Sequence, residues 1–153
     1  MNSFLLDTNI ISMLAPSRAE ASADFLDWLD RMDSDGRIFL SVVSIHEIEK
    51  GIALLEHKGA TAKAEKLKTW RDGLLSVYGD KILGFDAQAA GISGRAEAKA
   101  LAAGHDPGMA DAVIAGIARA QDLIIITHNT KHFLPFGVTA WSPNEAAGED
   151  GRT

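Results

Sequence analysis

Three acidic residues that are far apart in the sequence have the chemistry to bind one divalent cation. Asp7 follows a short apolar run, Glu47 lies just beyond a second apolar run, and Asp111 falls near the beginning of a late helical pattern. Hard cations such as Mg²⁺ and Mn²⁺ prefer oxygen ligands, and they are usually held by a few carboxylates together with waters and a substrate phosphate. A cation held in this way can generate an attacking hydroxide and stabilise the charge that develops when a phosphodiester is hydrolysed. The acids therefore indicate metal-dependent hydrolysis, provided that the fold brings them together.

Three polar residues accompany these acids. Thr8 directly follows Asp7, and Thr127 and Asn129 stand at the end of the apolar run 123–127 or just beyond it. In open parallel sheets, ligands bind in the crevice outside the carboxyl ends of the strands. We therefore expect the acids and Asn129 to face one crevice.

Each acid alone also has a purely structural interpretation. Asp7 precedes a Thr-Asn pair and could cap a turn. Glu47 has capping-box spacing from Ser44, and Asp111 could favour the dipole of its helix. Independent caps have no reason to gather at the same end of successive strands, so the combination favours a shared site.

The periodicity of apolar residues predicts strands that alternate with helices. The expected strands cover residues 4–6, 38–43, 82–85, 123–127 and 138–141, the last at an edge of the sheet. Ser17 and Glu20 have capping-box spacing ahead of a helix that ends at the turn 33–36. Such alternation is typical of a three-layer α/β/α sandwich with a central, mostly parallel sheet of four or five strands. One domain is expected over residues 1–141, followed by a polar tail, 142–153, that is partly disordered.

Composition limits the possible cellular location and ligands of the protein. The chain has 153 residues, of which 46% are hydrophobic and 24% charged, and this balance suits one globular domain. It has no cysteine, which fits the reducing cytoplasm and excludes thiol catalysis and Cys-ligated zinc. No apolar run reaches membrane-spanning length, so we expect a cytoplasmic protein that does not enter a membrane. The net charge of −6 argues against a broad basic face for a nucleic-acid duplex, and the basic stretch 50–71, with acids interspersed, is interpreted as a solvated helix face.

Four short segments carry a family resemblance. They are residues 5–9 (LLDTN), 44–47 (SIHE), 111–115 (DAVIA) and 127–133 (THNTKHF). In this order and at these separations they resemble the PIN-domain nucleases, and within that family the toxin subunits of VapBC-type toxin–antitoxin pairs. The resemblance covers the chain from residue 4 to about residue 141.

The resemblance implies a PIN-like fold and a Mg²⁺- or Mn²⁺-dependent endoribonuclease with Asp7, Glu47 and Asp111 as its acidic centre. Asp7 and Asp111 would hold the principal ion. Glu47 would bind through water or help to hold a second ion. The hydroxyls of Thr8 and Thr127 would orient ligands or waters.

The fourth position of the family's acidic centre is often Asp, and in this chain it is Asn129. A neutral ligand there leaves the binding of a second ion open. The resemblance also implies an RNA substrate, a homodimer and a cognate antitoxin that blocks the cleft, commonly by inserting a basic side chain among the acids. His128 is a further candidate for contact with a substrate phosphate.

Two other functions remain open from the sequence. A phosphoacceptor signalling domain also places Asp residues after parallel strands, with Asp7 and Asp86 in those roles and Lys131 behind them. That interpretation leaves Glu47 and Asp111 unexplained, and Asp86 is also explained as a helix cap. The second alternative is a catalytically degenerate PIN-like module that only binds a partner.

Overall fold

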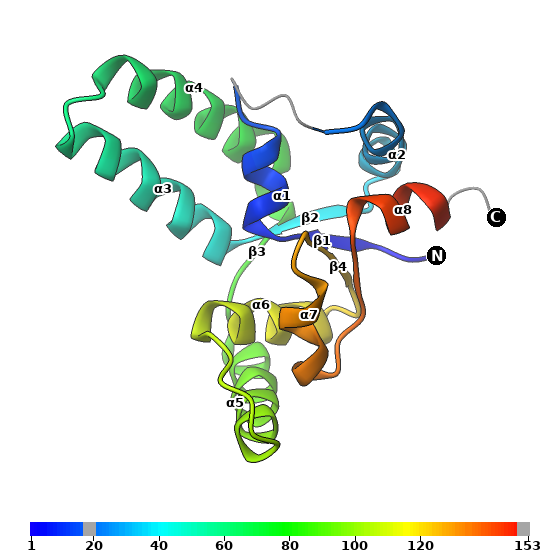
Figure 1. The fold of residues 1–153 in the computed structure, drawn as a ribbon. Helices are drawn as coiled ribbons and strands as arrows, with labels where there is room; N and C mark the ends of the chain where they lie inside the picture. The colour runs from blue at the N-terminus through cyan, green and yellow to red at the C-terminus, as the bar shows by residue number, and fades with distance from the viewer. Residues whose placement is uncertain (17–20, 150–153) are drawn as a thin grey trace.

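Five short parallel strands form the centre of the molecule (Figure 1). The structure is a computed structural model, and it describes residues 1–16 and 21–149. The strands are β1 (Phe4–Leu6), β2 (Ile38–Ser41), β3 (Ile82–Leu83), β4 (Ile124–Ile126) and β5 (Ala140–Trp141). They lie in the order β3-β2-β1-β4-β5, and every neighbouring pair is parallel. Each expected strand is present, and β5 lies at an edge as predicted.

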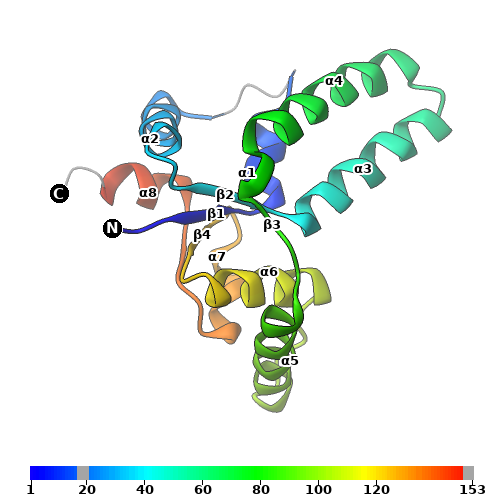
Figure 2. The same cartoon turned by 180° about the vertical axis from the view of Figure 1, so that it is seen from behind.

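Helices cover both faces of this sheet, which confirms the predicted three layers (Figures 1 and 2). One face is covered by α1 (Thr8–Met13), α2 (Ala23–Ser34), α3 (Val42–His57), α4 (Thr61–Tyr78) and α8 (Pro143–Glu149). The other face is covered by α5 (Ala87–Ala102), α6 (Met109–Ala120) and α7 (Thr130–Phe133), and the 3-10 turns are η1 (Gly79–Lys81) and η2 (Leu134–Phe136). Across residues 1–16 and 21–149, none of these helices combines the length and the apolar character that crossing a membrane requires.

Alternation along β1 divides its side chains between two separate cores. Phe4 and Leu6 belong to the core beneath α1 to α4, where the rings of Phe4 and Trp28 lie 4.8 Å apart between centroids. Leu5 belongs to the opposite core, together with Ile125 of β4. Because the sheet is covered on both faces, its strands are almost continuously apolar rather than apolar at alternate positions, with Ser41 at the end of β2 as the exception among the described strands.

Small residues hold α6 against α5. Gly116 of α6 lies so close to α5 that an added Cβ would meet the carbonyl oxygen of Ala89 at 2.6 Å and the Cβ of Ser93 at 2.7 Å. The Ser93 hydroxyl donates to the carbonyl oxygen of Ala112 at 2.9 Å. This packing fixes the position of α6, whose first turn carries Asp111.

Helices α3 and α4 form a hairpin that projects beyond the sheet (Figures 1 and 2). Of the α4 residues, all of which the structure describes, Ala64 alone is buried. Ion pairs join the two helices at the surface, with 2.9 Å between Lys68 Nζ and Glu56 Oε2 and 2.9 Å between Arg71 Nη1 and Glu49 Oε1. The prediction of a solvated face with interspersed charges is confirmed for these residues.

Helix α3 begins earlier than the sequence pattern predicts. Strand β2 ends at Ser41, whose hydroxyl accepts from the backbone N–H of Ser44 at 3.3 Å and caps α3. The predicted capping box from Ser44 to Glu47 is therefore wrong, because both residues lie inside the helix. Their side chains are available for contacts with other elements.

The cap of α2 also differs from the predicted one. Helix α2 begins at Ala23, and the hydroxyl of Ser22 accepts from the backbone N–H of Phe25 at 3.2 Å. The capping box predicted from Ser17 and Glu20 lies outside the described residues.

The segment after Ser142 forms a helix where composition predicts a polar tail. The Ser142 hydroxyl accepts from the N–H of Glu145 at 3.1 Å, and the Glu145 carboxylate accepts from the N–H of Ser142 at 3.2 Å, which is a complete capping box. Pro143 occupies the first helical position, where its fixed φ favours the helix. Ala146 is fully buried in the core beneath α1 to α4. The packed domain therefore extends to Glu149 rather than ending at residue 141, and the end of the expected tail, residues 150–153, lies outside the described residues.

Candidate active site

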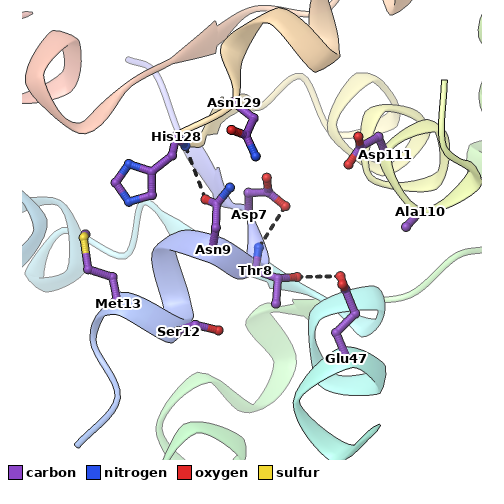
Figure 3. A pocket seen from close by; sticks show the side chains of 10 residues that line it. All are labelled: Asp7, Thr8, Asn9, Ser12, Met13, Glu47, Ala110, Asp111, His128 and Asn129. Carbon is purple, nitrogen blue, oxygen red and sulfur yellow. Dashed lines mark hydrogen bonds between the residues drawn. The ribbon is translucent and has the colours of Figure 1, made fainter. Parts of the chain in front are cut away.

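A pocket of about 640 Å³ opens at the carboxyl ends of β1 and β4 (Figure 3). It is lined by Asp7, Thr8, Asn9, Ser12, Met13, Glu47, Ala110, Asp111, His128 and Asn129. Five of the six predicted site residues are in this lining, and the sixth, Thr127, is fully buried and bonded to Asp7. The structure thus brings the three predicted acids to one pocket from three separate elements.

Asp7 is the most constrained of the three acids. It directly follows β1 and caps α1, and its carboxylate accepts from the backbone N–H of Thr8 at 2.8 Å and from the hydroxyl of Thr127 at 2.7 Å. Its exposed fraction is 6%. Burial raises the pKa of Asp7, the two hydrogen bonds lower it, and the nearby charge of Glu47 raises it. The net direction is upward, so the anion of Asp7 lacks compensation that a cation would provide.

Thr127 organises the floor of the pocket. Besides donating to Asp7, its hydroxyl accepts from the backbone N–H of Asn129 at 3.0 Å and from the side-chain amide of Asn9 at 3.4 Å. Asn9 also accepts from the backbone N–H of His128 at 3.3 Å, so it ties α1 to the loop after β4. Asn9 is not among the predicted site residues, although its place two residues after Asp7 in the segment LLDTN is a signal that could have identified it.

Glu47 reaches the pocket from the second turn of α3. Its Oε1 accepts from the hydroxyl of Thr8 at 2.8 Å (Figure 3), and the same hydroxyl lies 2.8 Å from the hydroxyl of Ser44. Thr8 and Thr127 therefore each donate to one of the acids that the resemblance names as metal ligands, which is consistent with the expectation that their hydroxyls orient ligands or waters. Ser44 is completely buried and is a further residue that the sequence assigned only to a helix cap.

Asp111 faces Asp7 from the first turn of α6 and is the more open of these two acids, with 28% of its side chain exposed (Figure 3). Its Oδ2 lies 3.6 Å from Nδ1 of His132, a largely exposed residue of α7. Burial raises the pKa of Asp111, the charge of Asp7 raises it, and His132 lowers it, with a net upward direction. His132 is not among the predicted site residues, and its place in the segment THNTKHF is the signal that could have found it.

The donor set of the pocket suits a hard divalent cation. In the described part of the chain, no group of three or more Asp, Glu, His or Cys side chains is close enough to hold a metal ion unaided. The pocket nevertheless presents carboxylates and the amide of Asn129, with no cysteine. Mg²⁺ usually keeps several waters and needs only one or two direct carboxylates, so its binding does not require three acids in contact. Burial is the main cause that raises the pKa of Asp7 and of Asp111, and a bound cation would favour their ionised forms.

Comparison with known proteins gives the same family as the motifs. The family model described as "PIN domain" matches residues 4–134. Plasmid stability protein StbB of Pseudomonas syringae is 35% identical over 143 residues, covering 93% of this chain and 99% of that protein. Toxin FitB of Neisseria gonorrhoeae is 30% identical over 140 residues, covering 91% and 96% of the two chains. The tRNA(fMet)-specific endonuclease VapC of Shigella flexneri is 28% identical over 137 residues, covering 87% and 91%.

Solved structures share the fold described above. The crystal structure of FitAcB from Neisseria gonorrhoeae superposes with a TM-score of 0.73 at 28% identity, covering 92% of this chain and 97% of that chain. DNA-bound VapBC from Salmonella typhimurium gives a TM-score of 0.73 at 23% identity, covering 94% and 99%. A toxin–antitoxin complex from Klebsiella pneumoniae gives a TM-score of 0.59 at 20% identity, covering 92% and 98%. Together with the family match over residues 4–134, these likenesses establish that the chain belongs to the PIN domain family.

Proposed function

We propose that this protein is a Mg²⁺- or Mn²⁺-dependent endoribonuclease of the cytoplasm that acts as the toxin of a type II toxin–antitoxin pair. The observation that carries the proposal is the convergence of Asp7, Glu47 and Asp111 on one pocket at the carboxyl ends of β1 and β4. Phosphodiester hydrolysis needs charge stabilisation and an activated water, and a pocket of oxygen donors around a cation is suited to supply both.

Five side chains of the pocket have a defined part in this proposal. Asp7 and Asp111 hold the principal ion, and Glu47 holds a water or helps to hold a second ion. When bound, the cation lowers the pKa of a water and neutralises charge that develops on the phosphate. Asn129 would contribute a neutral oxygen, and His128, which also lines the pocket, would contact a substrate phosphate.

The partners follow from the relatives and from the charge of the pocket. One relative is named as a transfer RNA endonuclease and another as a toxin, and several solved neighbours are toxin–antitoxin complexes. We therefore propose an RNA substrate, a cognate antitoxin that closes the acidic pocket, and a homodimer as the active form. A basic side chain of the antitoxin would favour the ionised forms of Asp7 and Asp111, whose pKa values are raised mainly by burial.

The phosphoacceptor alternative has little support from the position of Asp86. Its carboxylate accepts from the N–H of Ala89 at 2.9 Å and caps α5, and it does not line the pocket of Asp7. Strand β3, which precedes Asp86, is also separated from β1 by β2. The alternative of a degenerate PIN-like module that only binds a partner is decided by the experiment that follows.

The test is cleavage of a mixed RNA pool by purified protein loaded with Mn²⁺, with the cut ends mapped. We expect Asp7→Asn and Asp111→Asn each to lower the cleavage rate by more than about 100-fold, because even partners of metal ligands commonly contribute 10- to 100-fold. Addition of a chelator should abolish cleavage, and renewed Mn²⁺ should restore it.

A matched control is available on α2. Asp24 and Asp111 both lie in the first turn of a 12-residue helix, but Asp24 is exposed and does not line the pocket. Asp24→Asn should cleave RNA at the rate of the unmodified protein. Intact RNA after incubation with metal-loaded unmodified protein would favour the degenerate module instead.

A further inference from the structure

A clamp of two side chains from α3 holds Thr8 at the end of β1. The hydroxyl of Thr8 lies 2.8 Å from Glu47 Oε1 and 2.8 Å from the hydroxyl of Ser44. Ser44 and Glu47 are three residues apart on α3, so they lie on the same face of the helix, one turn apart. Ser44 is 0% exposed, so bulk solvent does not reach its hydroxyl.

The direction of both hydrogen bonds follows from the number of protons. A hydroxyl has one proton to donate, and an ionised carboxylate only accepts. Thr8 therefore donates its proton to Glu47, and the bond between the two hydroxyls must be donated by Ser44. Ser44 thus prevents the Thr8 proton from turning away from Glu47.

No competing use of the Ser44 hydroxyl is present among the described residues. A serine inside a helix often bonds a backbone carbonyl one turn earlier, but the hydroxyl of Ser44 bonds Thr8 of a different element. The cap of α3 is supplied by Ser41, so Ser44 has no role in capping either. The buried hydroxyl is committed to Thr8.

We infer that Ser44 is a positioning residue for the acidic pocket, which orients Glu47 through Thr8 and so tunes the affinity of the pocket for a divalent cation. This inference rests on the proposed function, because it assigns to Glu47 a part in metal binding. The clamp occupies Oε1 of Glu47 and leaves Oε2 for a metal-bound water or a second ion. Without the Ser44 proton, Thr8 can rotate, and Glu47 loses its fixed orientation.

The experiment is a double-mutant cycle with Ser44→Ala and Thr8→Val, read out by calorimetric titration of metal-free protein with Mn²⁺. Each single substitution should weaken Mn²⁺ binding by about tenfold, in the range found when partners of metal ligands are removed. The double variant should bind no more weakly than either single variant, because Ser44 acts only through Thr8. A cycle of unfolding measurements on the same metal-free proteins should also show coupling between the two residues.

Ser41→Ala is the matched control. It removes a buried hydroxyl and the cap of the same helix, and it leaves the Ser44 hydroxyl in place. We expect it to lower the melting temperature while Mn²⁺ affinity stays unchanged. A loss of affinity in Ser41→Ala equal to that in Ser44→Ala would show a merely structural effect and would overturn the inference.

The remaining outcomes separate this inference from the proposed function. Wild-type Mn²⁺ affinity in Ser44→Ala, or losses that add up in the double variant, would overturn the role of Ser44 and leave the nuclease assignment standing. If the unmodified protein neither bound Mn²⁺ nor cleaved RNA, the proposed function would fail and the inference would fail with it.

Discussion

Two helix pairs carry acids of the pocket, and they differ in how they are held together: α5 and α6 by close packing, and α3 and α4 by ion pairs at the surface. Helix α6, with Asp111 in its first turn, packs against α5 through Gly116, Ala89 and Ser93 so closely that one added methyl group does not fit. Helix α3, with Glu47, pairs with α4 in a hairpin that projects from the sheet and is joined by exposed ion pairs.

The difference implies two ways of placing a functional carboxylate. Asp111 is placed by core packing, because any shift of α6 moves its first turn. Glu47 is held at the base of the hairpin by the hydroxyl of Thr8, which the hydroxyl of Ser44 contacts in turn, and the ion pairs farther out contribute little. The comparison therefore predicts large effects of packing changes on α6, and small effects of charge changes on the α3–α4 hairpin.

The largest effect is expected from Gly116→Ala. The added Cβ would lie 2.6 Å from the backbone oxygen of Ala89, so α5 and α6 must separate. Overpacking of this kind costs about 1–3 kcal/mol of unfolding free energy. We expect RNA cleavage to fall as well, because the shift of α6 displaces Asp111. Urea unfolding and the cleavage assay measure the two effects.

Gly94→Ala on α5 is the control for this substitution. Both glycines lie in helices, but a Cβ at Gly94 would have no atom within 4 Å. The usual advantage of Ala over Gly in a helix should therefore stabilise the protein by about 0.5–1 kcal/mol. Equal stability of Gly116→Ala and Gly94→Ala would contradict the packing argument.

A change of pH should have an intermediate effect on stability. The effect should come from Asp7 and from Asp111, which lies in the first turn of α6. The pKa values of Asp7 and Asp111 are raised in the folded protein, mainly by burial, so the folded protein keeps these protons to a higher pH than the unfolded chain does. Their contribution to stability is therefore fully present below the ordinary value of 3.8 and is lost as the pH rises through the raised pKa values.

Asp111→Asn isolates this contribution. In metal-free protein, the melting temperature of the variant relative to the unmodified protein should increase as the pH rises from 3.8 towards neutrality, because the variant lacks one of the two facing charges. Saturating Mn²⁺ should reverse the order, since it stabilises only a protein that binds it. A difference in melting temperature that does not change with pH would contradict the proposed electrostatic cost.

The sequence sufficed to predict the strands and the acids that follow them. Asp7 ends an apolar run and Asp111 begins a helix, and in a parallel sheet such positions lie at the same edge. Asn129 was predicted for the same reason and lines the pocket, whereas Thr127 was predicted only from the family resemblance and donates to Asp7.

Short local spacings predicted the helix caps less reliably than apolar runs predicted the strands. Within the described residues, the spacing Ser-x-x-Glu occurs at Ser44 and at Ser142, but only the second is a capping box. At the first, Ser41 caps the helix instead of Ser44, because the strand ends at Ser41, two residues before the predicted end at residue 43. Spacing alone cannot distinguish these cases, since the choice depends on where the preceding strand stops pairing. The contact between Asn9 and Thr127 spans most of the chain and has no local signature.

The smallest effect is expected from Lys68→Met, which breaks the ion pairs with Glu56 and Glu65 and keeps the aliphatic stem. Its effect on the free energy of unfolding should be smaller than that of Gly94→Ala, and it should fade at 1 M salt, where exposed charges are screened. Mn²⁺ affinity should not change, because Glu47 is oriented at the base of the hairpin by Thr8. A Lys68→Met protein with weakened Mn²⁺ binding would mean that charges along the whole hairpin place Glu47, and the distinction between the two helix pairs would be lost.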